Sequence, residues 1–289
     1  MSDSSPLPLP PSMPMPMPMP MPAATGWDGH LHVFDGRPLP AGHYQAPNRT
    51  LADWAALAAP LGLGRGLLVQ PSVLGSDNAL LLQALASAPG RHRGVVVLAG
   101  DETDAALDRM AEAGVRGMRL NLVSPPGLYD DAAALLGRLA PRLRARGWFV
   151  QWYAPPAQWG QVAALSAQHG LLPVLDHLAG VTPAVWAAGT VLRDLAPLAD
   201  LGGWLKLSGW YRLQASPPYD TLLPAIDALQ GLFAGRCLWG SDWPHTRFME
   251  PGVPGPVPSY ASLLQPLHQA LGATAAQAVL HDAPARLLA

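Results

Sequence analysis

Eight short apolar segments, each followed by an amphipathic stretch, constrain the fold of this chain more than any other feature of its sequence. We expect β-strands at residues 27–34, 66–70, 94–99, 116–121, 148–153, 172–176, 204–208 and 236–241. The helical pattern is found at residues 51–59, 77–88, 103–113, 130–146, 157–169, 183–200, 219–233, 260–271 and 274–280. Apolar residues fill the strands continuously instead of alternating with polar ones, which is typical of parallel strands covered on both faces.

Strand–helix units of roughly 30 residues, repeated eight times, predict an α/β protein of the (β/α)8 TIM-barrel class. A doubly wound open sheet also alternates strands and helices, but it usually carries a glycine-rich phosphate turn after its first strand. Here the first strand carries His30 and His32 instead. Because side chains two positions apart on a strand share a face, both imidazoles should project to the same side. The pattern therefore favours the barrel.

The first 24 residues differ in composition from the rest of the chain. Met and Pro alternate over residues 13–22, and proline at every second position excludes a helix and removes every second donor from a β-ladder. We interpret residues 1–24 as a disordered, Met/Pro-rich tail and residues 25–289 as a single barrel domain. With 49% hydrophobic residues in the chain, this domain can bury a large core.

Composition and charge exclude several classes of function. Lys206 is the only lysine among 18 basic residues, the formal net charge is −2, and no basic stripe is present, so we expect no nucleic-acid partner. No apolar run approaches the ~20 residues of a membrane span, so we expect no membrane partner. The N-terminus lacks the features of a secretory signal, and the single Cys237 excludes an internal disulfide. These features favour a cytoplasmic protein, monomeric or homo-oligomeric, that acts on a small molecule.

Polar residues follow most of the expected strands. In a barrel of this class the catalytic groups lie where the strands end and the loops begin, on one rim. The polar residues at these ends are His30 and His32, Gln70 and Ser72, Arg119 and Asn121, Gln151 and Tyr153, Asp176 and His177, Ser208 and Arg212, and Asp242 with His245. Burying such residues without partners is costly. The sequence therefore predicts a polar cavity at one end of the barrel.

From about residue 27 to its end, the chain resembles the amidohydrolase superfamily, and within it the branch of 2-pyrone-4,6-dicarboxylate lactonase. The motifs that carry the resemblance occur in order: Asp28-Gly29-His30-Leu31-His32-Val33-Phe34, Val69-Gln70-Pro71-Ser72, Gly75-Ser76-Asp77-Asn78, Gly114-Val115-Arg116-Gly117-Met118-Arg119-Leu120-Asn121, Leu175-Asp176-His177, Lys206-Leu207-Ser208, Leu238-Trp239-Gly240-Ser241-Asp242-Trp243-Pro244-His245 and Pro284-Ala285-Arg286-Leu287. The resemblance implies a barrel hydrolase that opens a lactone ring.

The resemblance also bears on metal content. Two-metal members of the superfamily carry a bridging Lys or Glu at the fourth strand and a histidine at the fifth. This chain has Arg119 at the first position and Gln151 or Tyr153 near the second, so a dinuclear site lacks ligands. The lactonase branch works without metal, which implies that no cofactor is needed here. The alternative is a single Zn²⁺, since three protein ligands and a water suffice, with ligands drawn from His30, His32, His177 and Asp242.

We assign Asp242 as the general base, because a carboxylate at a strand end beside imidazoles can take a proton from water that attacks a lactone carbonyl. His30, His32 and His177 would polarise that carbonyl and stabilise the oxyanion. The alternatives are that Asp242 caps the following turn and that His177 is a core histidine with satisfied hydrogen bonds. We expect Asp28 to orient the first strand and not to react.

Six residues are expected to bind the substrate. Arg119 and Arg212 suit a carboxylate, because a guanidinium binds it with two parallel hydrogen bonds; structural salt bridges are the alternative for both. Three of the others match substrate-contacting positions of the lactonase, and the fourth follows the last strand: Tyr44, Ser72, Tyr153 and His245.

The loop at residues 122–128 limits the substrate, because it lacks a cation whereas the dicarboxylate enzyme has basic residues there. We therefore predict a carboxylated lactone or pyrone-like ester, with one carboxylate as an alternative to two. The runner-up is a mononuclear zinc hydrolase or decarboxylase of the same superfamily. A non-catalytic ligand-binding barrel is the alternative from another class, and the intact set of histidines with Asp242 argues against it.

Overall fold

The strands of the main sheet are parallel, and each is hydrogen-bonded to the next one along the chain. They are β1 (Gly26–Leu31), β4 (Leu63–Val69), β5 (Arg93–Val96), β6 (Val115–Asn121), β7 (Phe149–Tyr153), β8 (Pro173–Leu175), β9 (Trp204–Ser208) and β10 (Cys237–Gly240). This computed structural model describes residues 25–39, 44–123, 131–250, 252, 253 and 255–289. The predicted tail at 1–24 and most of the loop at 122–128 lie outside the described residues.

The sheet closes between β1 and β10. The backbone N–H of Asp242 donates to the carbonyl of His30 over 2.8 Å, and that of His32 donates to the carbonyl of Trp243 over 2.8 Å. Gly240 permits this approach, because a Cβ there would lie 2.6 Å from the Cβ of His30. The closure confirms the predicted (β/α)8 barrel and places its first and last strands side by side.

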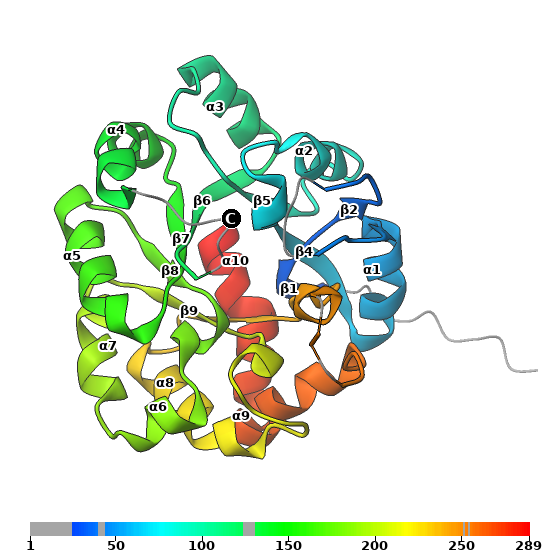
Figure 1. Cartoon of the computed structure of the whole chain (residues 1–289), viewed down its shortest axis with the longest axis vertical. Coiled ribbons are helices and arrows are strands. Elements are labelled where there is room, and N and C mark those ends of the chain that lie inside the picture. The colour runs from blue at the N-terminus through cyan, green and yellow to red at the C-terminus, as the bar shows by residue number, and fades with distance from the viewer. Residues whose placement is uncertain (1–24, 40–43, 124–130, 251, 254) are drawn as a thin grey trace, which may run out of the picture.

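Helices surround the ring of strands, and the last helix lies across it (Figure 1). They are α1 (Leu51–Ala58), α2 (Ala79–Ala86), α3 (Asp104–Glu112), α4 (Ala132–Ala145), α5 (Trp159–His169), α6 (Pro183–Ala187), α7 (Val191–Asp200), α8 (Leu223–Leu232), α9 (Gln265–Gln277) and α10 (Ala283–Leu288). The larger apolar core lies between these helices and the outer face of the sheet. Within the described residues, no helix combines the length and the apolarity that crossing a bilayer requires.

A second apolar cluster fills the barrel interior. It contains Trp27, Leu67, Val69, Val95, Phe149, Val174, Trp204, Leu238, Ala283 and Leu288. The last two belong to α10, which crosses the middle of the ring in Figure 1. Arg93 Nε on β5 donates to the carbonyl of Leu288 over 2.8 Å. The C-terminal helix therefore closes the barrel at the amino-terminal ends of the strands, and the polar groups collect at the other end.

Some element boundaries differ from those expected. The helix expected at 183–200 is two helices, because Gly189, with a φ of +74°, interrupts the helical path between α6 and α7. The first strand ends at Leu31, after which β2 (Phe34–Asp35) pairs with β3 (Asn48–Arg49). The break expected between 271 and 274 is a kink at Gly272 within α9. The sequence pattern did not predict α10.

Candidate active site

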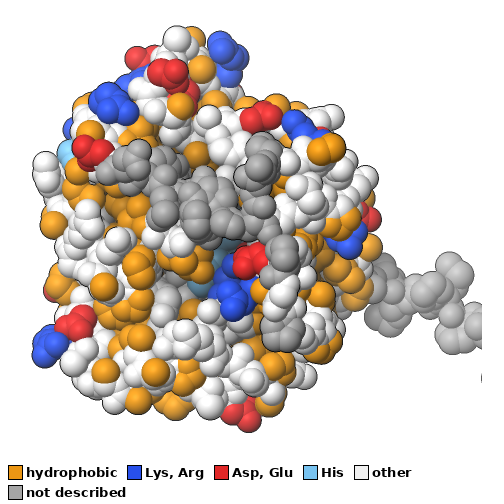
Figure 2. Space-filling view, viewed as in Figure 1, with side chains coloured by type: hydrophobic (Ala, Val, Ile, Leu, Met, Phe, Trp, Pro, Cys, Tyr) orange, Lys and Arg blue, Asp and Glu red, His pale blue; other side chains and the backbone are white. Residues whose placement is uncertain are grey.

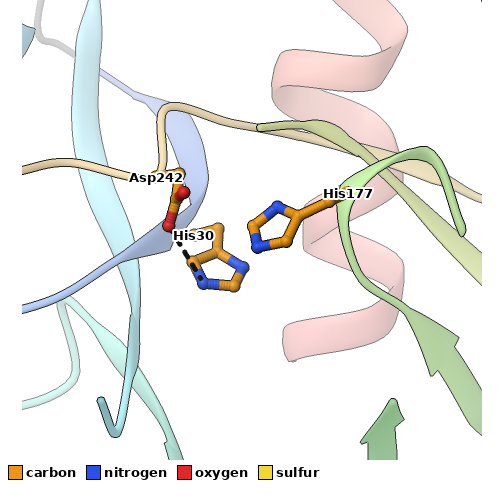
Figure 3. Close-up of side chains that lie close together, drawn as sticks. All are labelled: His30, His177 and Asp242. Atoms are coloured by element: carbon orange, nitrogen blue, oxygen red, sulfur yellow. Dashed lines mark ion pairs between the residues drawn. The ribbon is translucent and has the colours of Figure 1, made fainter. Parts of the chain in front are cut away.

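Three imidazoles and one carboxylate meet at the carboxyl end of the barrel. His30 lies on β1 and His32 directly after it, while His177 follows β8 and Asp242 follows β10 (Figure 3). The ring centroids of His30 and His32 are 5.0 Å apart, and those of His30 and His177 are 4.8 Å apart. Asp242 Oδ1 lies 3.7 Å from His30 Nε2 and 3.3 Å from His32 Nε2. All four residues are buried. These distances show that the structure brings together the predicted catalytic set.

Unusual backbone conformations place two of these groups. His177 has a φ of +50° and Asp242 a φ of +57°, in the left-handed region that residues other than glycine rarely adopt. Gly209 makes room for His177, because a Cβ there would lie 2.5 Å from its Nδ1. Such conformations persist only where surrounding contacts hold them, and they cluster at functional sites.

The two oxygens of Asp242 have different surroundings. Oδ2 accepts hydrogen bonds from the Tyr211 hydroxyl (2.6 Å) and from Arg212 Nε (2.5 Å). Oδ1 is buried and has no hydrogen-bond partner among the described residues. Burial by itself raises the pKa of Asp242, but the charge of Arg212 holds that pKa well below its usual value. Asp242 is therefore an ionised carboxylate with one oxygen fixed and the other facing the histidines.

The partners of the histidine rings determine part of their proton arrangement. His32 Nδ1 lies 2.7 Å from the carbonyl oxygen of Val69, which only accepts, so Nδ1 carries a hydrogen. Its other ring nitrogen, Nε2, lies 3.3 Å from Asp242 Oδ1. His177 Nδ1 lies 3.0 Å from the Ser208 hydroxyl, which can donate or accept. Burial lowers the pKa of His30 well below its usual value and the pKa of His177 to about 4, so both rings are neutral at neutral pH.

Lys206, on β9, lies fully buried beside His30. Its Nζ lies 2.6 Å from Gln151 Oε1, 3.2 Å from His30 Nδ1 and 3.4 Å from Asp176 Oδ1. Gln151 Nε2 in turn donates to Asp176 Oδ2 over 2.9 Å. Burial lowers the pKa of Lys206 to about 8, although the charge of Asp176 acts in the opposite direction. A buried network of amine, amide and carboxylate thus adjoins the Nδ1 side of His30.

Asp28 belongs to a separate cluster that joins β1 to β10. Its carboxylate accepts hydrogen bonds from the side chains of Trp54 (3.0 Å), Ser241 (2.5 Å) and Tyr260 (2.8 Å). It also accepts from the backbone N–H groups of His30 (3.1 Å) and Ser241 (2.9 Å). This geometry agrees with the expectation that Asp28 orients the first strand.

Three of the predicted binding residues are neighbours on the rim. Arg119 Nη1 donates to Ser72 Oγ over 2.9 Å, and Asn121 Nδ2 donates to the same oxygen over 2.6 Å. Because both lone pairs of that hydroxyl are engaged, its hydrogen is free to donate to a third group. Arg119 Nε also lies 3.4 Å from Asp176 Oδ2, and its guanidinium lies 5.8 Å from the centroid of the Tyr153 ring. Ser72, Arg119 and Tyr153 therefore form one polar corner.

The other three predicted binding residues surround the loop after β10. Arg212 Nη2 donates to Thr246 Oγ1 over 2.7 Å, in addition to its bond with the carboxylate of residue 242. Burial raises the pKa of the Tyr44 hydroxyl to about 12. The ring of His245 packs edge-to-face on that of Tyr211, with centroids 5.6 Å apart. Arg212 therefore also holds Asp242 and Thr246 in addition to any contact with a substrate. The binding roles of Tyr44 and His245 stay predictions.

The molecular surface is hollowed near the centre of the view in Figure 2, where histidine, basic and acidic side chains are visible among apolar ones. A separate groove of about 690 Å³ has a lining that includes Trp243, His245 and Phe248. Its lining does not include Asp242 or the imidazoles of His30, His32 and His177. The groove therefore adjoins the site at His245 but does not contain the predicted catalytic residues.

Sequence reasoning missed the roles of Lys206 and Tyr211 and assigned none to Asp176. Lys206 carried a usable signal, because it is the only lysine and interrupts the apolar strand Trp204–Ser208. Tyr211 carried none, because nothing in a loop sequence indicates that its hydroxyl will meet a carboxylate from another strand.

A metal ion would find ligands in part of this site. His30, His177 and Asp242 offer ligand atoms that all lie within 4.8 Å of one another. Two of the polar atoms here, His30 Nε2 and Asp242 Oδ1, lack hydrogen-bond partners in the described part of the chain. Two nitrogens and one oxygen fit a single zinc ion, whose catalytic sites use three protein ligands and a water. No second group of this kind occurs among the described residues.

Comparisons with known proteins agree with this architecture. The family model described as amidohydrolase matches residues 27–289. A 4-sulfomuconolactone hydrolase of Rhizobium radiobacter is 32% identical over 238 residues, which cover 78% of this chain and 77% of that protein. A 2-pyrone-4,6-dicarboxylate hydrolase of Comamonas testosteroni is 30% identical over 280 residues, 90% of this chain and 88% of that protein. The crystal structure of a Pseudomonas putida protein assigned as a 2-pyrone-4,6-dicarboxylic acid hydrolase has a TM-score of 0.74 and 34% identity, covering 92% of this chain and 97% of that one.

Proposed function

The chain belongs to the amidohydrolase family, and on this premise we propose that it is a hydrolase that opens the ring ester of a carboxylated lactone or pyrone. Two relatives that match most of the chain are named for the hydrolysis of such rings, one sulfonated and one dicarboxylated. The observation that carries the proposal is the buried Asp242 Oδ1, which has no hydrogen-bond partner among the described residues and faces two imidazoles.

In the proposed reaction, Asp242 Oδ1 takes a proton from the water that attacks the lactone carbonyl carbon. The depressed pKa of Asp242 keeps this carboxylate ionised at neutral pH. Its other oxygen is held by Tyr211 and Arg212, so the base is oriented before the substrate arrives. His32 Nε2 lies 3.3 Å from Oδ1, close enough to contact the same water.

Attack converts the carbonyl oxygen into an oxyanion. His30 lies beside His177 and near the base, and we propose that both histidines donate to this oxygen. When the tetrahedral intermediate collapses, the bond between the carbonyl carbon and the ring oxygen breaks. The proton on Asp242 then moves to the ring oxygen, which restores the base and leaves an open-chain acid.

The acid group of the substrate would bind at the polar corner of Ser72, Arg119 and Tyr153. The Ser72 hydroxyl already accepts two hydrogen bonds, so it can donate its hydrogen to an anionic oxygen. The guanidinium of Arg119 supplies a positive charge at the same place, and a guanidinium suits a carboxylate or another planar anion. Arg212, Tyr44 and His245 are proposed to contact the rest of the ring.

For the metal content, we propose hydrolysis without a metal ion, because Lys206 and Arg212 already bring positive charge against His30 and Asp242. The alternative is a mononuclear zinc enzyme of the same family, which the convergence of His30, His177 and Asp242 favours. A bound zinc would polarise the carbonyl as a Lewis acid.

The experiment is a turnover assay on matched lactones and 2-pyrones that carry no, one or two carboxylates. We expect hydrolysis of the acid-bearing rings with kcat/KM at least about tenfold above that of the uncharged ring, because one charge-assisted contact contributes about 1.5 kcal/mol or more. Turnover of the uncharged rings alone would refute the roles of Arg119 and Arg212. Absence of turnover for every ring would refute the proposed function.

A further inference from the structure

We propose that Lys206 fixes His30 in the tautomer that carries its hydrogen on Nε2, which makes His30 a donor to the substrate carbonyl and opposes metal binding through that nitrogen. Lys206 is thus a positioning residue that acts through His30. The role as donor to a carbonyl rests on the proposed function. The tautomer itself rests only on the contacts around His30.

His30 Nδ1 has two polar neighbours, and they demand opposite tautomers. Lys206 Nζ, at 3.2 Å, only donates, so a hydrogen bond with it requires a bare Nδ1. Asp176 Oδ1, also at 3.2 Å, only accepts, so a bond with it requires Nδ1–H. The Lys206 contact has hydrogen-bond geometry, whereas Asp176 Oδ1 has no hydrogen-bond partner among the described residues. A neutral imidazole carries one hydrogen, and with Nδ1 accepting, that hydrogen is on Nε2.

The position of the Lys206 amine is itself determined by a second contact. Gln151 Oε1 accepts from Nζ over 2.6 Å, and the amide of Gln151 cannot turn over because its Nε2 donates to Asp176 Oδ2. The bond to His30 needs one N–H and the bond to Gln151 another. An ammonium has three and a neutral amine two, so the arrangement holds in either protonation state.

Burying this lysine is difficult to explain by stability alone. A buried ion pair often contributes no more to stability than well-packed apolar side chains would, because desolvation offsets the attraction. Lys206 is fully buried in the strand Trp204–Ser208, where its neighbours are apolar. The hydrogen bonds that its amine donates to His30 and Gln151 account for a lysine at this position.

The tautomer decides what His30 can do. With hydrogen on Nε2, His30 can donate to a developing oxyanion in the cavity that it shares with Asp242. A metal ligand instead needs a bare Nε2, and ligand histidines usually donate Nδ1–H to a carboxylate. Asp176 stands where such a carboxylate would be, and the Lys206 amine competes with it for Nδ1. Removal of the amine would therefore let His30 donate to Asp176 and expose a bare Nε2.

The first test needs no variant of Lys206. Long-range ¹⁵N–¹H correlation spectra of the full chain, labelled with ¹⁵N-histidine, distinguish protonated from bare ring nitrogens. The His30 signals are identified by their loss in His30→Gln. We expect hydrogen on Nε2 of His30 in the unsubstituted protein. Hydrogen on Nδ1 would overturn the proposal.

The second test compares Lys206→Met with Arg119→Met. Both remove one positive charge beside Asp176, but only the first removes the donor to His30 Nδ1. We expect the tautomer to change only in Lys206→Met, with zinc binding by calorimetry tightened roughly tenfold or more over Arg119→Met. In Lys206→Met we also expect kcat on an acid-bearing lactone to fall, while KM changes little.

Equal zinc affinity and an unchanged His30 tautomer in the two variants would overturn the proposal. If Lys206→Met fails to fold, the spectrum of the unsubstituted protein still shows which ring nitrogen of His30 carries the hydrogen and so decides the proposal. A protein with hydrogen on Nε2 of His30 that turns over no lactone would refute the proposed function and leave the tautomer standing.

Discussion

His30 Nε2 and Asp242 Oδ1 face each other across 3.7 Å at the end of the barrel, buried, and neither has a hydrogen-bond partner among the described residues. Buried polar atoms are nearly always paired, since an unpaired one costs about 1–3 kcal/mol. We therefore propose that a reacting group binds at this pair. It is formed by the closure between β1 and β10 and by no local feature of either strand.

Asp242→Asn should lower kcat by about a hundredfold to ten-thousandfold, because an amide cannot accept the proton of the attacking water. KM should change little, since the side chain keeps its shape and its contact with Tyr211. Steady-state kinetics on an acid-bearing lactone measure both constants. Asp194→Asn, a partly exposed position on α7 away from the site, is the matched control and should retain full activity. Equal turnover in the two variants would remove the base from the mechanism.

Arg212→Met should move the acid limb of the kcat/KM profile to higher pH. The Arg212 charge favours the ionised form of Asp242 and so lowers its pKa. Without that charge the pKa rises, and the carboxylate becomes protonated, and therefore inactive as a base, at a higher pH than before. Arg193→Met, at an exposed site, is the control. An acid limb that stays in place would contradict the assigned coupling.

Ser72→Ala should raise KM for acid-bearing lactones about tenfold, which corresponds to the loss of one hydrogen bond to a charged group. The KM of an uncharged lactone should stay nearly constant, because the Ser72 hydroxyl is assigned to the acid group. The ratio of KM for the acid-bearing lactone to KM for the uncharged lactone distinguishes binding of the acid group from a general loss of structure. An equal rise for both substrates would show that Ser72 acts on the fold of the rim instead.

Asp28→Ala should lower the free energy of unfolding by about 3–5 kcal/mol, a typical cost of breaking a buried charged network. The substitution leaves the donors of Trp54, Ser241 and Tyr260 without their acceptor. Denaturant titration followed by fluorescence measures the change. Asp200→Ala, exposed at the end of α7, should stay within about 0.5 kcal/mol of the parent. Comparable stability of the two variants would mean that the cluster contributes little.

Treatment with a strong chelator should leave lactone turnover unchanged. Metal analysis of the treated protein verifies that no metal remains. The reason is that the proposed mechanism obtains its positive charge from side chains next to His30 and Asp242. If activity were lost and then restored by added zinc, the mononuclear zinc alternative at His30, His177 and Asp242 would be correct.

Sequence patterns were sufficient to predict the barrel and most of the proposed catalytic set. Continuous apolar runs predict strands buried on both faces, and their regular alternation with helices predicts that they form a closed ring. Within that class the ends of the strands share one rim, so the positions of His30, His177 and Asp242 in the sequence were enough to predict that they meet. The period of two in a strand likewise placed His30 and His32 on one side.

The pairing of these groups follows from the arrangement of the strands in space and could not be predicted from sequence patterns. Which oxygen of Asp242 is fixed by Tyr211 and Arg212, and which neighbour of His30 occupies Nδ1, depends on contacts between strands far apart in the sequence. Those contacts follow from left-handed backbone at His177 and Asp242 and from the close approach of Gly240 to His30. Local sequence patterns carry no information about such distances, because a shift of about one ångström between two elements exchanges one hydrogen-bond partner for another.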